Sequence, residues 1–393
     1  MVWITLRCMP DQRAPPPVTF KLRSRLALRL NSDIAACTGQ PITLALLQAQ
    51  RAILWVRHGW EVEARQALDH LHAQVLRHPG AELAAWLHLA EGLIAYYGTF
   101  GGGARDRVHR ALVMASAAHL PSLHALAAAW LAQMDFVSRD IDSLVTHARV
   151  ALTALGPADH GAGCRVGTAL GMAWNLAQND ALAADWYAWA RRHAVSEGDD
   201  ASISAVVYNQ AQMQALRIRH ATLATVASEA QTALVGAVSV GHYENAVGGV
   251  ARKDLTPLLQ AQLLTVQGEF AAAVPLLEAQ LPAAMAAGLA RTGGSLLADL
   301  AWCWANTGET LRARALADQA VIEALAEADD PRCDTDERAA LHARLAQVYA
   351  LLGLDTLAAR EADAATRAWS QDAEQRREWA IKLTSAGLCE PPR

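Results

Sequence analysis

Several residue clusters in the chain could in principle bind a metal. His70 and His72 are separated by one residue, and Glu91 follows His88 by three positions. A zinc site needs three or four ligands that converge on one point. Side chains two residues apart on a helix point in different directions, so His70 and His72 are poorly placed to share an ion. We therefore expect these histidines to be solvent-facing or core-edge side chains, and we expect no metal site.

Two other segments resemble parts of ion-binding or phosphate-binding loops. The acidic run from Asp329 to Glu337 resembles half of a calcium loop, but it lacks the central glycine and the terminal bidentate glutamate. The glycine-rich segment 98–103 lacks the Lys-Ser/Thr pair of a nucleotide-binding loop. The GxSxG and HExxH motifs are also missing from the sequence. We expect no catalytic residues and no cofactor.

The elements that would position any binding residues show a regular recurrence. Trp86, Trp130, Trp174 and Trp302 each follow an alanine within an alanine-rich segment, and the first three lie 44 residues apart. Recurrence at roughly 35–47 residues is typical of stacked helix pairs. We interpret these tryptophans mainly as residues that fill the gaps between helices. The alternative is that some of them line a groove and stack on a sugar or a peptide.

Composition supports an ordered, all-helical chain. Of the 393 residues, 53% are hydrophobic and 19% are charged, which is unlike a disordered protein. Alanine is abundant and favours helices that approach closely, whereas alternating β-branched runs are almost absent. We predict an all-α fold, a right-handed α-solenoid of about eight helix pairs. Each pair is expected to bury its apolar side only against the next pair in line.

Charge and hydropathy exclude two classes of partner. The net charge of -5 gives no basic footprint for nucleic acid, and no stretch approaches the ~20 apolar residues of a membrane span. The six cysteines show no metal-binding or disulfide framework, and the N-terminus lacks the apolar core of a signal peptide. We therefore expect a cytoplasmic protein.

The later helix pairs resemble tetratricopeptide repeats. The residues that carry the resemblance are Leu345, Tyr349, Gly353, Ala358 and Ala365 in one pair, and Leu300, Trp304, Gly308, Ala313 and Ala320 in another. They occupy the family's Leu, large-residue, turn-glycine and two small packing positions. The earlier pairs match poorly and are longer than the family's repeat. They resemble the divergent helical repeats of MalT-type regulators and of sensory regions that precede bacterial diguanylate cyclases.

This resemblance implies a domain organisation. It divides the chain into an N-terminal arm with a possible capping segment (1–40), divergent repeats (41–240), an irregular connector (241–251), better-matched repeats (252–379) and a C-terminal tail (380–393). Within the arm, 18–31 fits either a helix or a strand. It is either a helix that caps the first repeat or a basic amphipathic segment that touches a membrane or a partner.

The resemblance also implies that the first helix of each pair lines a concave groove. Its polar and aromatic positions nominate Gln50, Arg57, Gln133, Asn209, Gln210, Arg217, Gln262, Asp299, Trp302, Asn306, Arg344 and Gln347. Amides suit hydrogen bonding to a peptide backbone, and arginine suits carboxylate capture. We expect a non-enzymatic adaptor or sensory module that binds a protein or peptide, in bacterial signalling or regulation. The alternatives are a sensor of an oligosaccharide or metabolite, and an enzyme built as a closed α/α toroid.

Overall fold

The computed structural model describes residues 23–99, 103–224, 255–286, 293–327 and 334–392. All regular elements in these ranges are helices, which confirms the all-α prediction. The expected N-terminal arm over 1–17, the connector at 241–251 and the start of the acidic run at Asp329 lie outside the described residues. None of the helices in the described ranges is long and apolar enough to cross a membrane.

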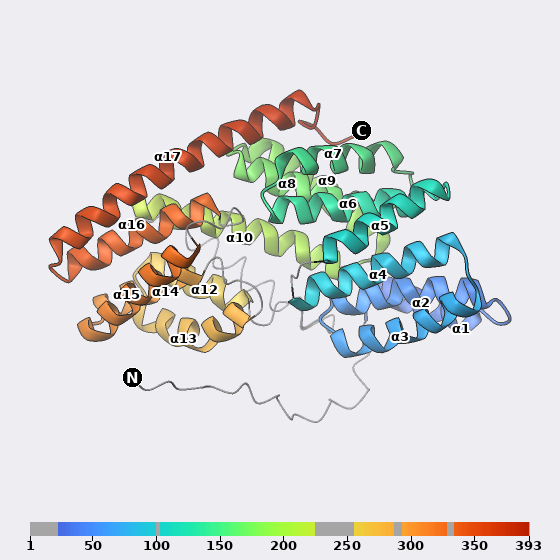
Figure 1. The fold of residues 1–393 in the computed structure, drawn as a ribbon, viewed down its shortest axis with the longest axis horizontal. Coiled ribbons are helices and arrows are strands. Elements are labelled where there is room, and N and C mark those ends of the chain that lie inside the picture. The colour runs from blue at the N-terminus through green and yellow to red at the C-terminus, as the bar shows by residue number, and fades with distance from the viewer. Residues whose placement is uncertain (1–22, 100–102, 225–254, 287–292, 328–333, 393) are drawn as a thin grey trace.

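The helices follow one another in antiparallel pairs (Figure 1). In the N-terminal half they are α1 (Arg25–Ala36), α2 (Pro41–Arg57), α3 (Glu61–Arg77), α4 (Ala81–Thr99), α5 (Ala104–Ala117), α6 (Pro121–Val137), α7 (Ile141–Ala154), α8 (His160–Leu176), α9 (Asp180–Glu197) and α10 (Asp200–Ala224). In the C-terminal half they are α12 (Leu255–Gln267), α13 (Phe270–Ala286), α14 (Gly293–Asn306), α15 (Thr310–Glu327), α16 (Thr335–Leu351) and α17 (Asp355–Ser385).

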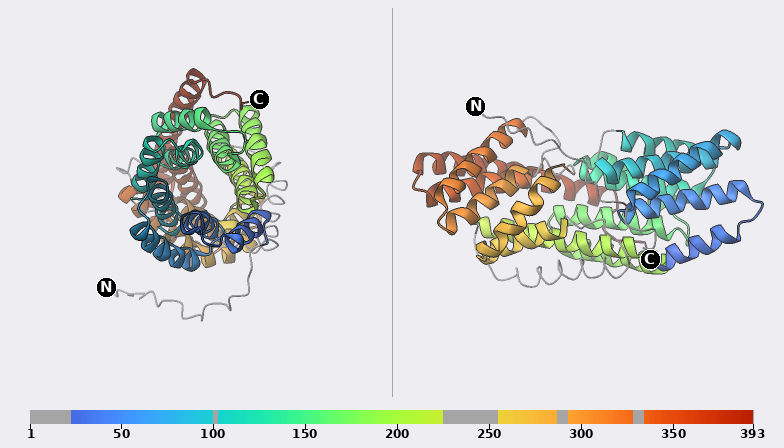
Figure 2. Two further views of the ribbon diagram at one scale, coloured as in Figure 1. Left: turned by 90° about the vertical axis from the view of Figure 1, so that its right-hand side faces the viewer. Right: turned by 90° about the horizontal axis from the view of Figure 1, so that it is seen from below.

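The pairs stack into the predicted right-handed solenoid. Within a pair the two helices contact each other, and the first helices of successive pairs, such as α2 and α4 or α14 and α16, also pack together. Viewed along the stack, the N-terminal helices surround a common axis (Figure 2). First helices therefore form the inner wall of the superhelix, and second helices form the outer wall.

The same turn joins the two helices of several pairs, in the divergent repeats as well. Gly59, Gly308 and Gly353 adopt positive φ there, as the sequence predicts. Arg139 and Gln178 take the same left-handed conformation at φ 59° in α6–α7 and α8–α9. In all these turns the next amide donates to the carbonyl five residues earlier, at 2.8–2.9 Å. The divergent repeats thus keep the turn and accept the strain of a non-glycine residue in it.

The tryptophans mostly pack between helices, as interpreted from the sequence. Trp130 and Trp174 are 2% exposed, and Trp186 is fully buried. In the α8–α9 pair the small residues lie on the first helix, because Gly167 and Gly171 of α8 face the large side chains of α9. This reverses the family pattern, in which the second helix supplies the small residue, and it explains the poor sequence match.

The expectation that each pair packs only against its neighbours is wrong at the C-terminus. Helix α17 is continuous over 31 residues, runs past the expected end of the repeats at 379, and returns to α7 and α8. Trp379 packs edge-on against Phe136 with ring centroids 5.8 Å apart. The indole Nε1 of Trp174 donates to the Leu388 carbonyl at 2.8 Å. The end of the chain is therefore anchored on the middle of the solenoid.

The ambiguous N-terminal segment caps the first repeat. Its described part is helix α1, which begins after Ser24, whose hydroxyl accepts a hydrogen bond from the Ala27 amide at 3.1 Å. Ala27 and Leu30 are buried with Leu54 of α2. The structure thus agrees with the capping interpretation over residues 25–36.

We predict that the returning part of α17 contributes to the stability of the whole solenoid. Leu383 is fully buried, so Leu383→Ala should lower the free energy of unfolding by about 2–5 kcal/mol, measured by urea denaturation. The matched control is Leu311→Ala, because Leu311 is 87% exposed and its truncation should cost less than about 0.5 kcal/mol. Equal effects of the two substitutions would contradict the packing of α17 described above.

Candidate functional site

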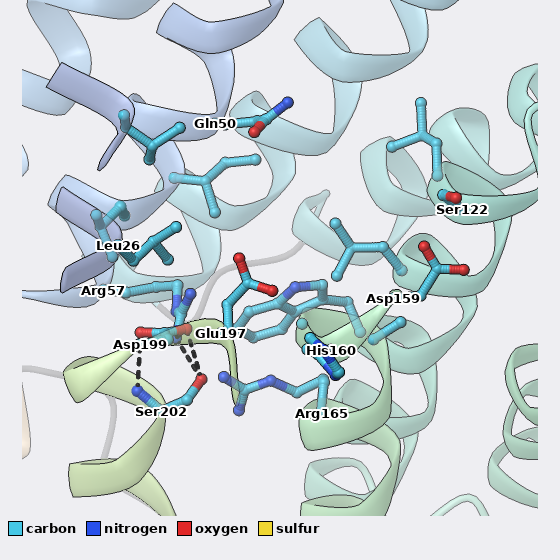
Figure 3. A pocket seen from close by; sticks show the side chains of 18 of the residues that line it. Leu26, Gln50, Arg57, Ser122, Asp159, His160, Arg165, Glu197, Asp199 and Ser202 are labelled. Atoms are coloured by element: carbon cyan, nitrogen blue, oxygen red, sulfur yellow. Dashed lines mark hydrogen bonds and ion pairs between the residues drawn. The ribbon is translucent and has the colours of Figure 1, made fainter. Parts of the chain in front are cut away.

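A pocket of about 250 Å³ lies on the inner wall of the N-terminal half (Figure 3). Five successive first helices border it: α2, α4, α6, the start of α8 and the start of α10. The capping helix α1 adds Leu26 and Leu30. The pocket therefore contains residues from almost 180 positions of sequence (26–202), brought together because the superhelix curves around its axis.

On one side the pocket is bounded by contacts between α2 and the turn that joins α9 to α10. Arg57 of α2 forms an ion pair with Asp199 at 2.6 Å and also donates to the Ser202 hydroxyl. Asp199 in turn accepts hydrogen bonds from the amide and hydroxyl of Ser202. On the outer side, the Leu26 amide donates to the Gly198 carbonyl at 2.9 Å, and Arg29 pairs with Glu197. These contacts join the beginning of the first superhelical turn, at α1 and α2, to its end, at the turn between α9 and α10.

Because Arg57 and Asp199 are buried together, the charged state of each residue depends on the presence of the other. Burial would raise the pKa of Asp199, but Arg57 and the hydrogen bonds from Ser202 lower it below its ordinary value. Burial would likewise lower the pKa of Arg57, and the facing carboxylate raises it. Both groups therefore stay charged, and removal of either one leaves an uncompensated charge in a poorly solvated position.

The remainder of the pocket combines aromatic, apolar and basic side chains. The Arg165 guanidinium lies 3.8 Å from the centre of the Trp130 ring, within the range of a cation–π contact. Tyr97 packs edge-on against the same indole at 6.0 Å. At the edge of the pocket, the Nδ1 atom of His160 lies 3.2 Å from Nδ1 of His193. Burial, together with the charges of His160 and Arg192, lowers the pKa of His193.

A second pocket, of about 620 Å³, lies between α9, α10 and α17. Amide side chains border it at Asn175, Gln178, Gln210 and Gln214. His220 also borders it and packs edge-on against Trp369 at 5.2 Å. Burial lowers the pKa of His220 to about 4. Unlike the inner pocket, this pocket combines residues of first helices, mainly α10, with residues of the second helices α9 and α17.

The structure divides the predicted groove residues between these two pockets and the interior. Gln50 and Arg57 line the inner pocket, and Gln210 and Arg217 line the second. Arg217 is exposed there and pairs with Asp180. Gln133 is buried, and its amide donates to the Met172 sulfur at 3.6 Å. Four further predicted residues are half-buried or exposed outside both pockets: Asn209, Gln262, Asn306 and Gln347.

Asp299 and Arg344, also predicted for the groove, belong to a buried ion network. Asp299 is fully buried and accepts from Arg344 at 2.9 Å and from Arg219 of α10 at 2.8 Å. Burial would raise the pKa of Asp299, but the two arginines lower it. Arg344 also donates to Gln347 and lies over the ring of the predicted Trp302. The hydrogen-bonding capacity of Asp299 and Arg344 is thus used to join α10, α14 and α16.

Neither Arg165 nor Asp199 was predicted from the sequence as a site residue, although a feature of the sequence points to each of them. Arg165 is the single charged residue within the apolar segment 161–174, where burial was predictable. Asp199 precedes Ser202 at the start of α10, and its carboxylate accepts from the Ser202 amide as a helix N-cap does. The contact of Asp199 with Arg57 could not be found in this way, because the two residues are separated by 142 positions.

Comparisons with known proteins support the fold. No protein-family model and no curated protein matches the sequence. Among solved structures, the chain is similar to the crystal structure of a Rap protein complexed with competence and sporulation factor, with a TM-score of 0.51. The match covers 88% of this chain and 98% of that chain, at 10% sequence identity. The chain therefore shares the helical-repeat fold of that structure.

We predict that the Arg57–Asp199 pair stabilises the closed first turn. Asp199→Asn should reduce the free energy of unfolding by about 3–5 kcal/mol at pH 7, because Arg57 would stay buried without its counter-ion. Asp180→Asn removes the partner of the exposed Arg217 and should cost less than about 1 kcal/mol. Because the pKa of Asp199 is lowered on folding, its contribution is present above the unfolded value and disappears as pH falls through the folded value. The deficit of the Asn variant in chemical denaturation should therefore shrink at pH 3, whereas a pH-independent deficit would contradict the pairing.

His220 should make the protein less stable in mild acid. Its folded pKa of about 4 lies below the unfolded value of about 6.5, so between these values the unfolded chain binds a proton that the folded chain excludes. Stability should fall by about 1–3 kcal/mol as pH decreases across this window. His220→Gln should remove most of that slope, and exposed His70→Gln should leave it intact. An unchanged slope in the His220 variant would count against a buried neutral imidazole.

Proposed function

We propose that this chain is a non-enzymatic helical-repeat module that binds a peptide or a segment of a partner protein, as an adaptor or sensor in bacterial regulation. The site is the inner pocket. The observation that carries the proposal is the convergence of five successive first helices on that pocket. This is the surface on which a helical-repeat protein presents its binding residues.

The chemistry of the inner pocket suits a peptide. Leu26, Leu123 and Leu126 supply apolar surface for a side chain. Gln50 is half-buried in the pocket wall, and its amide makes no hydrogen bond with the part of the chain that the structure describes. An amide offers both a donor and an acceptor, which is the pairing that a peptide backbone needs.

The carboxylates of the pocket favour binding over catalysis. A general acid or base must be able to exchange a proton with a substrate near neutral pH. Asp199 is held by Arg57, which keeps its pKa low, and Glu197 is paired with Arg29. These two carboxylates therefore serve to close the first turn. The third carboxylate of the pocket, Asp159, accepts a hydrogen bond from the Gly156 amide. These contacts support a module without catalytic activity.

The solved structure of similar fold gives independent support. That Rap protein is complexed with competence and sporulation factor. A protein of similar fold and comparable length is thus found in complex with a factor, which is the kind of role that we propose here. The resemblance of the early repeats to MalT-type regulators points instead to the second candidate, a sensor of an oligosaccharide or metabolite.

The second candidate is a sensor of a small metabolite or sugar. The size of the inner pocket, about 250 Å³, is near the lower limit of small-molecule sites, and its half-buried Trp86 could stack on a sugar ring. A metabolite that raises the melting temperature of the protein, when no peptide does so, would favour this candidate.

We predict that obstruction of the inner pocket abolishes peptide binding. Ser122 lies at the exposed start of α6 on the rim of this pocket (Figure 3). Ser122→Trp should reduce capture of peptides from a randomised pentapeptide pool at least about 10-fold, because the indole would occupy the entrance. Captured peptides would be counted by mass spectrometry after affinity selection on the full chain.

The matched control is Ser370→Trp, on an exposed turn of α17 that borders neither pocket. It should capture the same peptides as the unmodified protein. Undiminished capture by Ser122→Trp would move the binding site away from the inner pocket. Failure of the unmodified protein to capture any peptide would refute the proposed function.

A further inference from the structure

We infer that Arg165 binds the carboxylate of the ligand, and that the apolar group next to this carboxylate lies against Trp130 and the leucines of the inner pocket. The inference rests on the proposed function, because it concerns the same site. It specifies the ligand as a carboxylate joined to an apolar group. The C-terminal residue of a peptide has this chemistry, and so does a small aliphatic or aromatic acid.

Arg165 is a buried cation whose counter-ion is missing from the described chain. The residue is only 6% exposed and lines the pocket. Its guanidinium lies over Trp130, yet it forms neither a hydrogen bond nor an ion pair with any described residue. Buried charges in proteins are normally paired, because desolvation without a partner is costly. An unpaired guanidinium in a pocket therefore points to an anion supplied by the ligand.

The acidic residues of the pocket do not meet this need, because they already have partners. Asp199 pairs with Arg57, and Glu197 pairs with Arg29. Asp159 accepts a hydrogen bond from the Gly156 amide at 2.7 Å. In Figure 3 the Arg165 side chain extends from beneath His160 toward Ser202, on the same side of the pocket as Asp199.

The geometry of Arg165 suits a carboxylate in particular. The guanidinium lies over the Trp130 ring, and its N–H groups form no hydrogen bond with the described residues. Two of these N–H groups can donate to the two oxygens of one carboxylate. A phosphate fits less well, because its second negative charge would lie near Asp159, Glu197 and Asp199. Leu26, Leu123 and Leu126 favour an apolar group beside the carboxylate.

The inference can be tested with two N-acetylated randomised pentapeptide pools that differ only in their C-terminus, a free carboxylate or an amide. The unmodified full chain should capture the acid pool about 10- to 100-fold more strongly than the amide pool, the ratio for a hydrogen bond to a charged group. Phenylacetate, added as a competitor, should displace the acid peptides. Equal capture of the two pools would overturn the role of Arg165 and leave the proposed peptide binding intact.

Substitutions of Arg165 test whether this residue causes the preference for peptides with a free C-terminal carboxylate. Arg165→Met should abolish the difference between the acid and amide pools, and Arg165→Lys should retain part of it because the positive charge remains. Arg77→Met is the matched control, because Arg77 is exposed and borders neither pocket, and it should preserve the full preference. A preference that survives in a folded Arg165→Met protein would overturn the inference.

The two possible sources of the carboxylate give different results. If phenylacetate raises the melting temperature of the unmodified protein but not of Arg165→Met, and no peptide is captured, the ligand is a small acid. The role of Arg165 then holds, and the proposed peptide binding fails. If neither the peptides nor phenylacetate binds the unmodified protein, both the inference and the proposed function are overturned.

Discussion

The ion pair between Arg57 and Asp199 determines the form of the binding surface, because it joins the two ends of the first superhelical turn. An open solenoid would present its first helices along a shallow groove. Here the pair and the α1 contacts to the α9–α10 turn draw those helices around a single pocket. The same closure neutralises the carboxylate of Asp199 and leaves Arg165 as the cation that a ligand can reach. The shape of the inner pocket and the charge of its side chains thus both depend on the ion pair between Arg57 and Asp199.

The repeat architecture could be predicted from sequence because it depends on local features. Recurrent tryptophans, alanine-rich helices and turn residues such as Gly308 and Gly353 each report on contacts within a pair or with the next one. The pattern was harder to follow in the middle of the chain, where Arg139 and Gln178 form the glycine-like turn. The return of α17 could not be predicted, because it depends on how far the superhelix has rotated over more than 200 residues.

The candidate site was predictable only in part, for a related reason. Family positions indicate which face of a helix points inward, and two of the residues that they nominate, Gln50 and Arg57, line a pocket. They give no information on what lies across the superhelix. Asp299 and Arg344 also point inward, but Arg219 completes a buried network with them, so their charges are satisfied inside the protein. Arg165 points inward with no such partner among the described residues, and only the folded arrangement distinguishes the two cases.

A crystal structure of the full chain with a captured peptide tests the central claim most directly. The account predicts that the peptide occupies the inner pocket between α2, α6 and α8, with its terminal carboxylate at hydrogen-bond distance from the Arg165 guanidinium. The pair between Arg57 and Asp199 should remain intact in the complex. A peptide bound between α10 and α17, or on the outer helices with the inner pocket unchanged, would contradict the account.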